Sequence, residues 1–262
     1  MTRPGRRRAT LCLAAVVVLA GGWSLYNILE PRAVPLPGCA QPALWAHRGF
    51  HVVASENSVA SVGAAVSKGF CGAEIDVQWF SDRGLVVAHD EVEEGDLLPN
   101  ALTLAQLLDS LPQLPQYLWL DFKNLDVHNA GAAAAHIDSL IAAHHFAHRF
   151  VVESVSSVPL RMLWWHAPDV IPAYWINRPP HGWKGPLHDV QIAAAIGLLG
   201  LPALSVPKEM LTDHLLTYFG HLSLFTWTCN TEAEIEYARA HSARVVLTDG
   251  DFGLMNGQAP SQ

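Results

Sequence analysis

Three acidic side chains and one lysine lie in segments that otherwise have the pattern of buried strands. Glu74 and Asp76 alternate with apolar residues in Ala73–Val77, and Asp121 and Lys123 have the same spacing at the end of the next predicted strand. Side chains alternate between the faces of a strand, so each pair points to one face. Charged residues are rare in buried strands unless they have partners. Three carboxylates converging on one point would suit a hard divalent cation, calcium or magnesium.

The same charges could also be satisfied by ion pairs. Asp121 or Glu74 could pair with Lys123, or with Arg48 after the first predicted strand. A carboxylate cluster without a positive charge would repel itself and shift the pKa values of its members. Spacing alone leaves a bound cation and a set of ion pairs as open alternatives.

Elements that position these residues follow a regular alternation. The predicted strands are Leu44–Ala46, Ala73–Val77, Tyr117–Phe122, Val151–Ser154, Val170–Trp175, Pro202–Val206, Leu222–Thr228 and Arg244–Thr248. The predicted helices are Asn57–Lys68, Leu102–Ser110, Ala130–His145, Val158–His166, Leu187–Ile196, Lys208–Phe219 and Glu232–His241. Strict βα alternation predicts an α/β fold, either a closed parallel barrel or a doubly wound sheet. Eight strands favour a single (β/α)8 TIM barrel, in which chemistry lies at the carboxyl ends of the strands.

Composition limits the partners of this barrel. The chain has 262 residues, half of them apolar, which suffices for one large domain. Its formal charge is −8, and four of its 16 basic residues are Arg3, Arg6, Arg7 and Arg8, so the rest of the chain has 24 acidic residues against 12 basic ones. An acidic body argues against nucleic acid as a partner. An anionic substrate would need a local cation or a few placed basic residues.

The N-terminal segment predicts export. Residues 1–10 are basic and would stay in the cytoplasm, and the uncharged run 11–29 is long enough to cross a bilayer as a helix. A membrane anchor is favoured, and a cleaved signal that releases a secreted form is the alternative. Residues 30–42 are proline-rich and predict a linker, followed by the barrel at 43–256 and a tail at 257–262. The catalytic domain would then lie on the extracytoplasmic side.

Two cysteines are placed where a disulfide could form. Cys39 precedes the first predicted strand and Cys71 precedes the second. Neighbouring parallel strands would bring both to the N-terminal rim, where an oxidising compartment could join them. Ordinary buried thiols are the alternative.

Six segments, in order along residues 44–254, resemble the signature segments of the glycerophosphodiester phosphodiesterase family. They are Trp45–Gly49, Ser55–Ser58, Gly72–Val77, Val86–Asp90, Phe225–Asn230 and Leu247–Asp249. The combination of His-Arg-Gly, Glu-x-Asp and His-Asp is specific, although each alone would be weak. This resemblance implies a barrel that cleaves small anionic phosphodiesters with a divalent cation.

The resemblance also implies roles for individual residues. It places metal ligands at Glu74 and Asp76, and catalytic histidines at His47 and His89. It places phosphate contacts at Arg48 and Lys123, and Glu56 at the start of the first helix facing the site. Trp227 ends the seventh predicted strand and, on position alone, could form a wall of the pocket.

Two features depart from the family. The third metal ligand is usually the glutamate of a Glu-x-Lys segment, whereas this chain has Asp121, one methylene shorter. Members usually carry a small inserted subdomain after the His-Asp segment, and here only about thirty residues separate Asp90 from Asp121. Since that insertion helps to hold glycerol, its loss leaves the leaving group open.

The expected reaction is hydrolysis of a glycerophosphodiester to glycerol phosphate and an alcohol. One histidine would accept a proton from the nucleophile and the other would donate one to the leaving oxygen. One alternative is cleavage of a phospholipid, of the phospholipase C or D kind, in the same barrel. Another is a barrel that binds a phosphorylated ligand without turnover, with the Asp121 substitution as its sign.

Overall fold

The structure is a computed structural model that describes residues 18–19, 21–27, 30, 34–90, 92–176 and 184–252. Its eight barrel strands are β1 Ala43–Ala46, β2 Gly72–Phe80, β4 Tyr117–Phe122, β5 Phe150–Ser154, β6 Ile171–Trp175, β7 Ala203–Pro207, β8 Ser223–Trp227 and β9 Ala243–Thr248. The helices are α2 Val59–Ser67, α3 Leu104–Ser110, α4 Ala130–His144, α5 Ser157–His166, α6 Lys184–Leu199, α7 Asp213–Phe219 and α8 Glu232–Ala240. Every predicted strand is present, with ends that shift by up to three residues.

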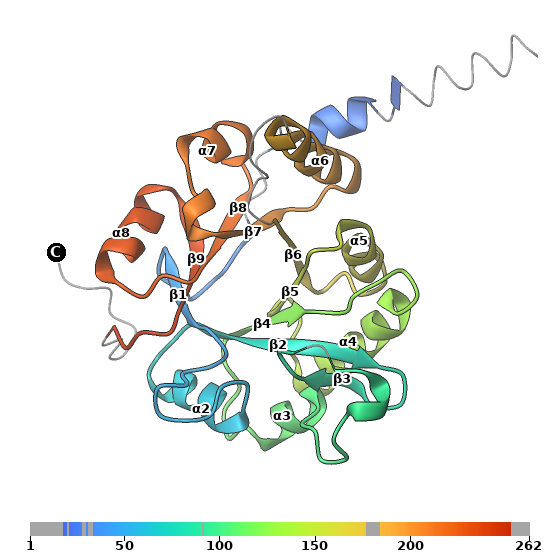
Figure 1. Cartoon of the computed structure of the whole chain (residues 1–262), viewed down its shortest axis with the longest axis vertical. Coiled ribbons are helices and arrows are strands. Elements are labelled where there is room, and N and C mark those ends of the chain that lie inside the picture. The colour runs from blue at the N-terminus through green and yellow to red at the C-terminus, as the bar shows by residue number, and fades with distance from the viewer. Residues whose placement is uncertain are drawn as a thin grey trace, which may run out of the picture.

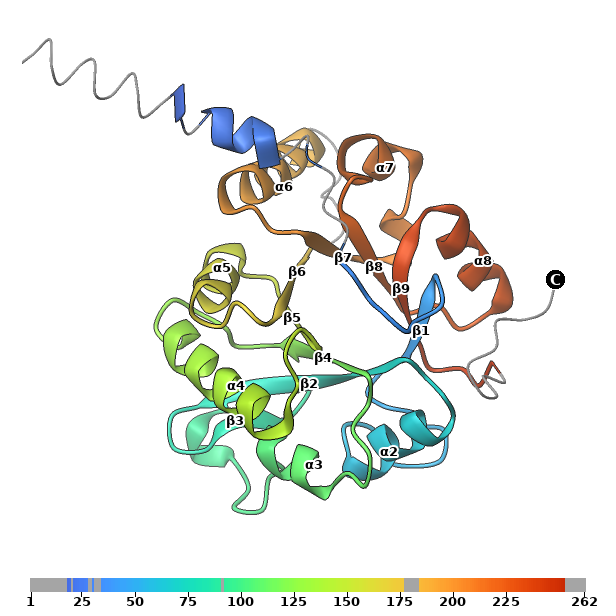
Figure 2. The same ribbon diagram turned by 180° about the vertical axis from the view of Figure 1, so that it is seen from behind.

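The strands close into a ring. Each barrel strand pairs in parallel with its neighbours, and β1 pairs with both β2 and β9. Figures 1 and 2 show this ring surrounded by the helices. The predicted (β/α)8 barrel is therefore confirmed.

One strand was not predicted. β3, Gly84–Val87, pairs antiparallel with the extended end of β2 and forms a hairpin outside the ring of parallel strands. Gly84 has a φ of 75°, a left-handed conformation that glycine adopts easily at a turn. The described part of the connection from β3 to β4, residues 88–116, contains only the 3-10 helix η1, Glu94–Asp96, and α3. As the sequence predicts, this connection has no inserted subdomain.

Side chains inside the barrel form two layers. The lower layer is an apolar cluster of alternate strand positions, which include Trp45, Trp119 and Phe225, together with Val34 and Leu36 from the segment before β1. Gly72 makes room for it, because a Cβ atom there would lie 2.5 Å from the Trp45 ring. Two residues further along, the inward positions of β2, β4, β5 and β7 are polar, whereas those of β6 and β8 are tryptophans. A dry lower layer therefore supports a polar upper layer at the carboxyl ends of the strands.

The outer faces of the strands pack against the helices. One apolar cluster joins the first half of the barrel to α2, α3, α4 and α5, and a second joins the other half to α6, α7 and α8. Ser58, Thr103 and Thr231 cap the N-termini of α2, α3 and α8 with capping boxes. Such caps contribute about 1 kcal/mol each. Both halves are thus anchored by burial and by local hydrogen bonds.

The N-terminal predictions have different outcomes. The structure joins Cys39 and Cys71 in a disulfide, with Cα atoms 5.7 Å apart, which confirms the predicted bridge. Most of the predicted membrane segment 11–29 lies outside the described residues. Within the described part of the chain, no helix is both long and apolar enough to cross a membrane. The described residues Trp23 and Asn27 donate hydrogen bonds to carbonyl oxygens of α6, where Figure 1 shows this segment beside that helix.

Candidate active site

The turn after β1 carries His47 and Arg48. Arg48 and Gly49 have φ angles of 51° and 72°, in the left-handed region that favours glycine. A Cβ atom on Gly49 would lie 2.6 Å from a backbone carbon of Ser61, so this position requires glycine. The Arg48 amide donates a hydrogen bond to Glu74 Oε2 at 2.8 Å. These contacts fix both side chains beside the end of β2.

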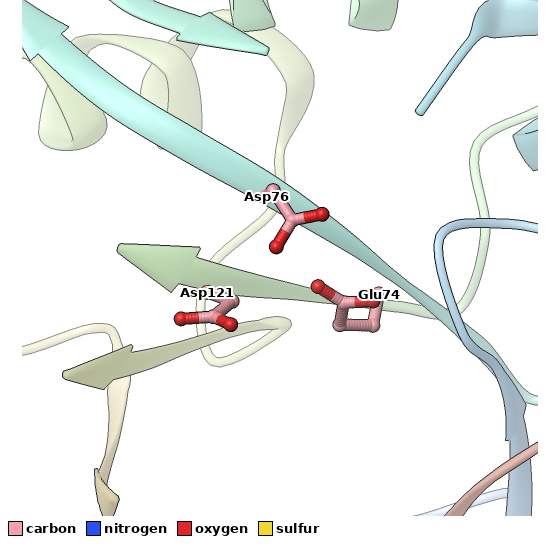
Figure 3. A group of neighbouring side chains, drawn as sticks. All are labelled: Glu74, Asp76 and Asp121. Atoms are coloured by element: carbon pink, nitrogen blue, oxygen red, sulfur yellow. The ribbon is translucent and has the colours of Figure 1, made fainter. Parts of the chain in front are cut away.

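Three carboxylates converge at the same end of the barrel. Figure 3 shows Glu74 and Asp76 on β2 and Asp121 on β4 pointing toward one space. Oxygen atoms from the three groups lie within 4.8 Å of one another. The side chains of Glu74 and Asp76 are almost fully buried, and Asp121 is half-buried. The three acids that the alternation pattern groups together therefore do lie together.

Burial makes this cluster unfavourable without added positive charge. Burial, together with repulsion from Asp76 and Asp121, raises the pKa of Glu74 well above its ordinary value. Burial also raises the pKa of Asp121, although Lys123 opposes that shift. Burial alone would lower the pKa of Lys123, but Asp121 and Asp76 outweigh it and raise that pKa. The three raised pKa values have one meaning: each group holds its proton more tightly, so the site favours added positive charge.

Ion pairs supply part of the positive charge that the three buried carboxylates require. Lys123 Nζ lies 2.7 Å from Asp76 Oδ1 and 2.5 Å from Asp121 Oδ2, and Arg48 Nε lies 3.3 Å from Asp76 Oδ2. Among the described residues, Glu74 has no ion pair with lysine or arginine, and its nearest ring nitrogen is His47 Nε2 at 3.9 Å. Ion pairs with Lys123 and Arg48 therefore satisfy Asp76 and Asp121, as one of the two alternatives predicts. They leave the Glu74 carboxylate without a lysine or arginine partner among the described residues. An all-oxygen donor set with an unneutralised buried member fits calcium or magnesium.

His47 is oriented by an acid from the far side of the ring. Its Nδ1 atom lies 2.7 Å from Asp249 Oδ1, just after β9. Asn230 donates to Asp249 Oδ2 at 2.7 Å and accepts from the Asp249 amide at 2.8 Å. Burial alone would raise the pKa of Asp249, but the hydrogen bonds from His47 and Asn230 lower it. An ionised Asp249 would keep the His47 proton on Nδ1, which leaves Nε2 facing the acids as a proton acceptor.

His89 is positioned through the backbone of its loop. Its ring contacts Asp90, with Nδ1 2.8 Å from Oδ1. The buried Gln78 amide donates to the carbonyl oxygens of Ala88 and Asp90, on either side of His89, and accepts from the Val92 amide. The Ala88 amide also donates to the Asp76 carbonyl oxygen at 3.1 Å. The loop that carries His89 is therefore tied to β2.

Two residues before α2 complete this side of the site. The exposed Glu56 carboxylate accepts hydrogen bonds from Arg48 Nη1 at both oxygens, at 3.1 and 3.0 Å. Asn57 donates to Asp76 Oδ2 at 2.7 Å and accepts from the Asp76 amide at 3.0 Å. Glu56 thus orients Arg48, while Asn57 fixes an acid of the cluster.

Trp227 belongs to the opposite half of the ring. It ends β8, stacks on Trp175 at 6.0 Å between ring centroids, and donates to Ser205 Oγ at 2.9 Å. The predicted site residues on β2, on β4 and in the turn after β1 are joined by direct contacts, whereas Trp227 contacts β6 and β7 and packs against the lower layer. Its aromatic surface therefore borders the upper layer from the side away from the acids.

Sequence reasoning missed four residues with a place in this arrangement. They are Asn57, Gln78, Glu153 and Asp249. Gln78 and Glu153 are polar residues at inward positions of strands, the same signal that identified Glu74. Asn57 and Asp249 lie within segments that carry the family resemblance, but only spatial contacts reveal what they touch.

Comparison with known proteins agrees with this geometry. Residues 47–154 match the model of the glycerophosphoryl diester phosphodiesterase family. A search of curated protein sequences gives no match to the chain.

Solved structures share the fold at low sequence identity. A putative glycerophosphodiester phosphodiesterase from Galdieria sulphuraria has a TM-score of 0.66 at 18% identity, covering 83% of this chain and 98% of that one. One from Silicibacter pomeroyi has a TM-score of 0.64 at 19% identity, covering 88% and 95%. An Oleispira antarctica phosphodiesterase, solved with the product sn-glycerol-3-phosphate, has a TM-score of 0.60 at 18% identity, covering 79% and 93%. The family match thus covers the part of the barrel that carries His47 and the three acids, and the solved structures share the fold of the whole barrel.

Proposed function

We propose that this enzyme hydrolyses a glycerophosphodiester to glycerol phosphate and an alcohol, with a divalent cation bound by Glu74, Asp76 and Asp121. The observation that carries the proposal is the convergence of these three carboxylates beside His47. The glycerol phosphate bound to the Oleispira antarctica neighbour supports this substrate class. Calcium and magnesium both fit the oxygen donors.

The cation would polarise a phosphoryl oxygen and neutralise charge that develops during cleavage. Arg48 and Lys123 add positive charge at the same place. Arg48 is fixed by Glu56, so its guanidinium is oriented before substrate arrives. Lys123 is anchored between two acids and stays protonated, because its pKa is raised. Together these groups favour an anionic diester in a barrel whose overall charge is negative.

The two histidines would move protons. His47 Nε2 faces the acids, and Asp249 stabilises the ring when it becomes protonated, so His47 suits the role of general base toward the attacking hydroxyl or water. His89 is 41% exposed on a loop at the edge of the site, which suits a general acid that protonates the departing alcohol. A carboxylate orients each ring, that of Asp249 beside His47 and that of Asp90 beside His89.

Activity assays on the full chain test this function. Glycerophosphocholine and glycerophosphoethanolamine would be supplied with calcium, with magnesium or with a chelator, and glycerol phosphate would be measured as product. We expect hydrolysis that stops with chelator and returns with one of the two cations. Turnover that is unchanged by chelator would remove the cation from the mechanism. Failure to cleave any glycerophosphodiester under all three conditions would refute the substrate class.

A phospholipid is a second candidate substrate. The loops that follow β1 and β5, at the same end of the barrel as the acids, expose the apolar side chains of Val52, Val53 and Val155. Such side chains would suit an acyl chain or a membrane surface better than free glycerophosphodiesters. Product analysis on phospholipid vesicles would distinguish the substrates, because phospholipid cleavage leaves a lipid product rather than glycerol phosphate.

We also propose that the barrel functions outside the cytoplasm, with residues 11–29 as its membrane anchor. The basic flank and the uncharged run support this orientation. The disulfide between Cys39 and Cys71 suits an oxidising compartment. A topology reporter fused after Gln262 tests the proposal, and a cytoplasmic signal would refute it.

A further inference from the structure

Glu153 lies one strand beyond the carboxylate cluster. It is the register partner of Asp121 across the β4–β5 pair. Register partners in a parallel sheet project from the same face, and Asp121 faces the space that the three acids share. Glu153 therefore points into the upper layer of the barrel, and the residue is only 4% exposed.

The Glu153 carboxylate is only half satisfied. Its Oε2 atom is buried and has no hydrogen-bond donor, while the carboxylate interacts with the Ser205 side chain. Burial first, and then repulsion from Asp121, raise the pKa of Glu153 well above its ordinary value. Buried acceptors normally have partners. The free oxygen therefore marks a place where a donor is expected.

The charges around Glu153 indicate the kind of donor. Apart from Asp249, which contacts His47, the upper layer contains four carboxylates, those of the cluster and Glu153, against the two basic side chains Arg48 and Lys123. Arg48 is shared with the exposed Glu56. If all four acids are ionised, the negative excess equals the charge of one divalent cation. Glu153 is not among the acids whose oxygens all lie within 4.8 Å of one another, so a bridging water suits it better than direct coordination.

We propose that Glu153 is a further residue of the cation site, whose free Oε2 atom accepts a hydrogen bond from a water molecule carried by the cation beside Asp121. Magnesium in particular keeps several of its waters in protein sites, and calcium sites also include them. Residues that hold such waters contribute to affinity although they do not touch the metal. The inference rests on the proposed function, from which it takes the cation.

Calorimetric titration of the full chain with calcium or magnesium tests the role without relying on turnover. Glu153→Gln keeps the shape of the side chain and removes its charge. We expect this variant to bind the cation roughly 10-fold or more weakly than the unaltered chain. The cation should also raise its melting temperature less, because stabilisation by a ligand depends on affinity.

Two matched glutamate-to-glutamine variants serve as controls. Glu236→Gln, which removes an exposed acid paired with Arg239 on α8, should bind the cation with unchanged affinity. Glu74→Gln should lose binding, which assigns the calorimetric signal to this site. If the unaltered chain binds neither cation, the proposed function fails at its metal site. If it binds, Glu74→Gln does not, and Glu153→Gln binds equally well, the cation site stands and the role of Glu153 is refuted.

A second substitution covers the case in which Glu153→Gln does not fold. Glu153→Asp keeps the charge but draws it back by one methylene, and it should weaken the affinity for the cation by at least several-fold. An affinity of Glu153→Asp equal to that of the unaltered chain would then overturn the inference, because a water contact at a defined position would not survive the shortening.

Discussion

The two halves of the barrel contribute differently to one site. In the first half, β2, β4 and β5 carry inward acids near their carboxyl ends, and His47 follows β1. In the second half, β6 and β8 end in the stacked Trp175 and Trp227. The family match, residues 47–154, ends with β5. Chemistry directed at phosphate is therefore concentrated in one half of a fold whose architecture repeats around the ring.

Packing does not explain this difference. Each half has its own extensive apolar cluster between strands and helices, and fully burying a large apolar side chain contributes about 1.5–3 kcal/mol in either half. The second half is linked to the chemistry by one acid, Asp249, which contacts His47 across the β9–β1 junction. Substitutions that leave the packing intact should therefore affect catalysis unequally in the two halves.

The largest effects are expected at the histidines of the first half. His47→Ala and His89→Ala should each lower kcat by roughly 100- to 10,000-fold, because a positioned general acid or base contributes that much. Circular dichroism should show an unchanged fold. A variant that keeps near-normal turnover would remove that histidine from the reaction and weaken the contrast between the halves.

Asp121 tests whether the acids of the first half act on the cation or only on Lys123. Asp121→Ala should weaken cation affinity and activity together, with excess cation restoring part of the rate, because one oxygen donor is lost. Asp121→Glu keeps the donor and should be tolerated. The measurement is activity as a function of cation concentration, beside a thermal melt of each variant. A lower melting temperature with an unchanged cation midpoint in Asp121→Ala would assign Asp121 to the ion pair alone.

The contact between the halves predicts an intermediate effect. Asp249→Asn keeps the side-chain shape but removes the charge that orients His47 and stabilises its protonated ring. We expect kcat to fall by roughly 10- to 100-fold, with a displaced acidic limb of the pH–rate profile, which is the limb that reports a general base. Asp251→Asn is the control, because Asp251 pairs with Lys68 instead. A fall in kcat without any change in the pH profile would indicate a structural role only.

Stability as a function of pH should differ in sign between the halves. Glu74 has a pKa raised above the ordinary 4.5, so the native state holds its proton more tightly, and stability of the cation-free protein should fall as pH rises above about 4.5. In the second half, Lys208 lowers the pKa of Glu234 to about 2. Its contribution is present above the ordinary value and is lost as pH falls toward 2.

Urea unfolding in chelator checks both directions. Glu74→Gln should flatten the decline in stability as pH rises above about 4.5, and Glu234→Gln should flatten only the change at acid pH. The contribution of the partly exposed Glu234 pair should be small, because solvent screens it. If Glu74→Gln leaves the neutral-pH slope unchanged, the buried acids of the first half are not the source of that slope.

The strands and the acids could be predicted from the sequence because both depend on local periodicity. Short apolar or β-branched runs located all eight barrel strands, and the two-residue period of a strand placed Glu74 and Asp76 on one face and grouped Asp121 with them. The hairpin strand β3 was missed because four residues with one glycine carry too weak a pattern. Contacts between distant segments, such as Asp249 with His47, depend on how the ring closes, which no local pattern encodes.

Substitution of Trp227, in the second half of the barrel, should have the smallest effect on catalysis. It touches neither the acids nor His47 in the described contacts, and its ring borders the site through its stack on Trp175. Trp227→Phe keeps an aromatic face but loses the hydrogen bond to Ser205, so KM for the best substrate should rise by only a few-fold, with kcat nearly unchanged. Such a pattern is expected when a residue binds substrate and transition state equally. Steady-state kinetics on two diesters with different alcohols measures it, because a wall that contacts the alcohol should change the ratio of their KM values. A large loss of kcat with an unchanged ratio of KM values would instead assign Trp227 to the chemical step. The catalytic residues would then not be concentrated in the first half of the barrel.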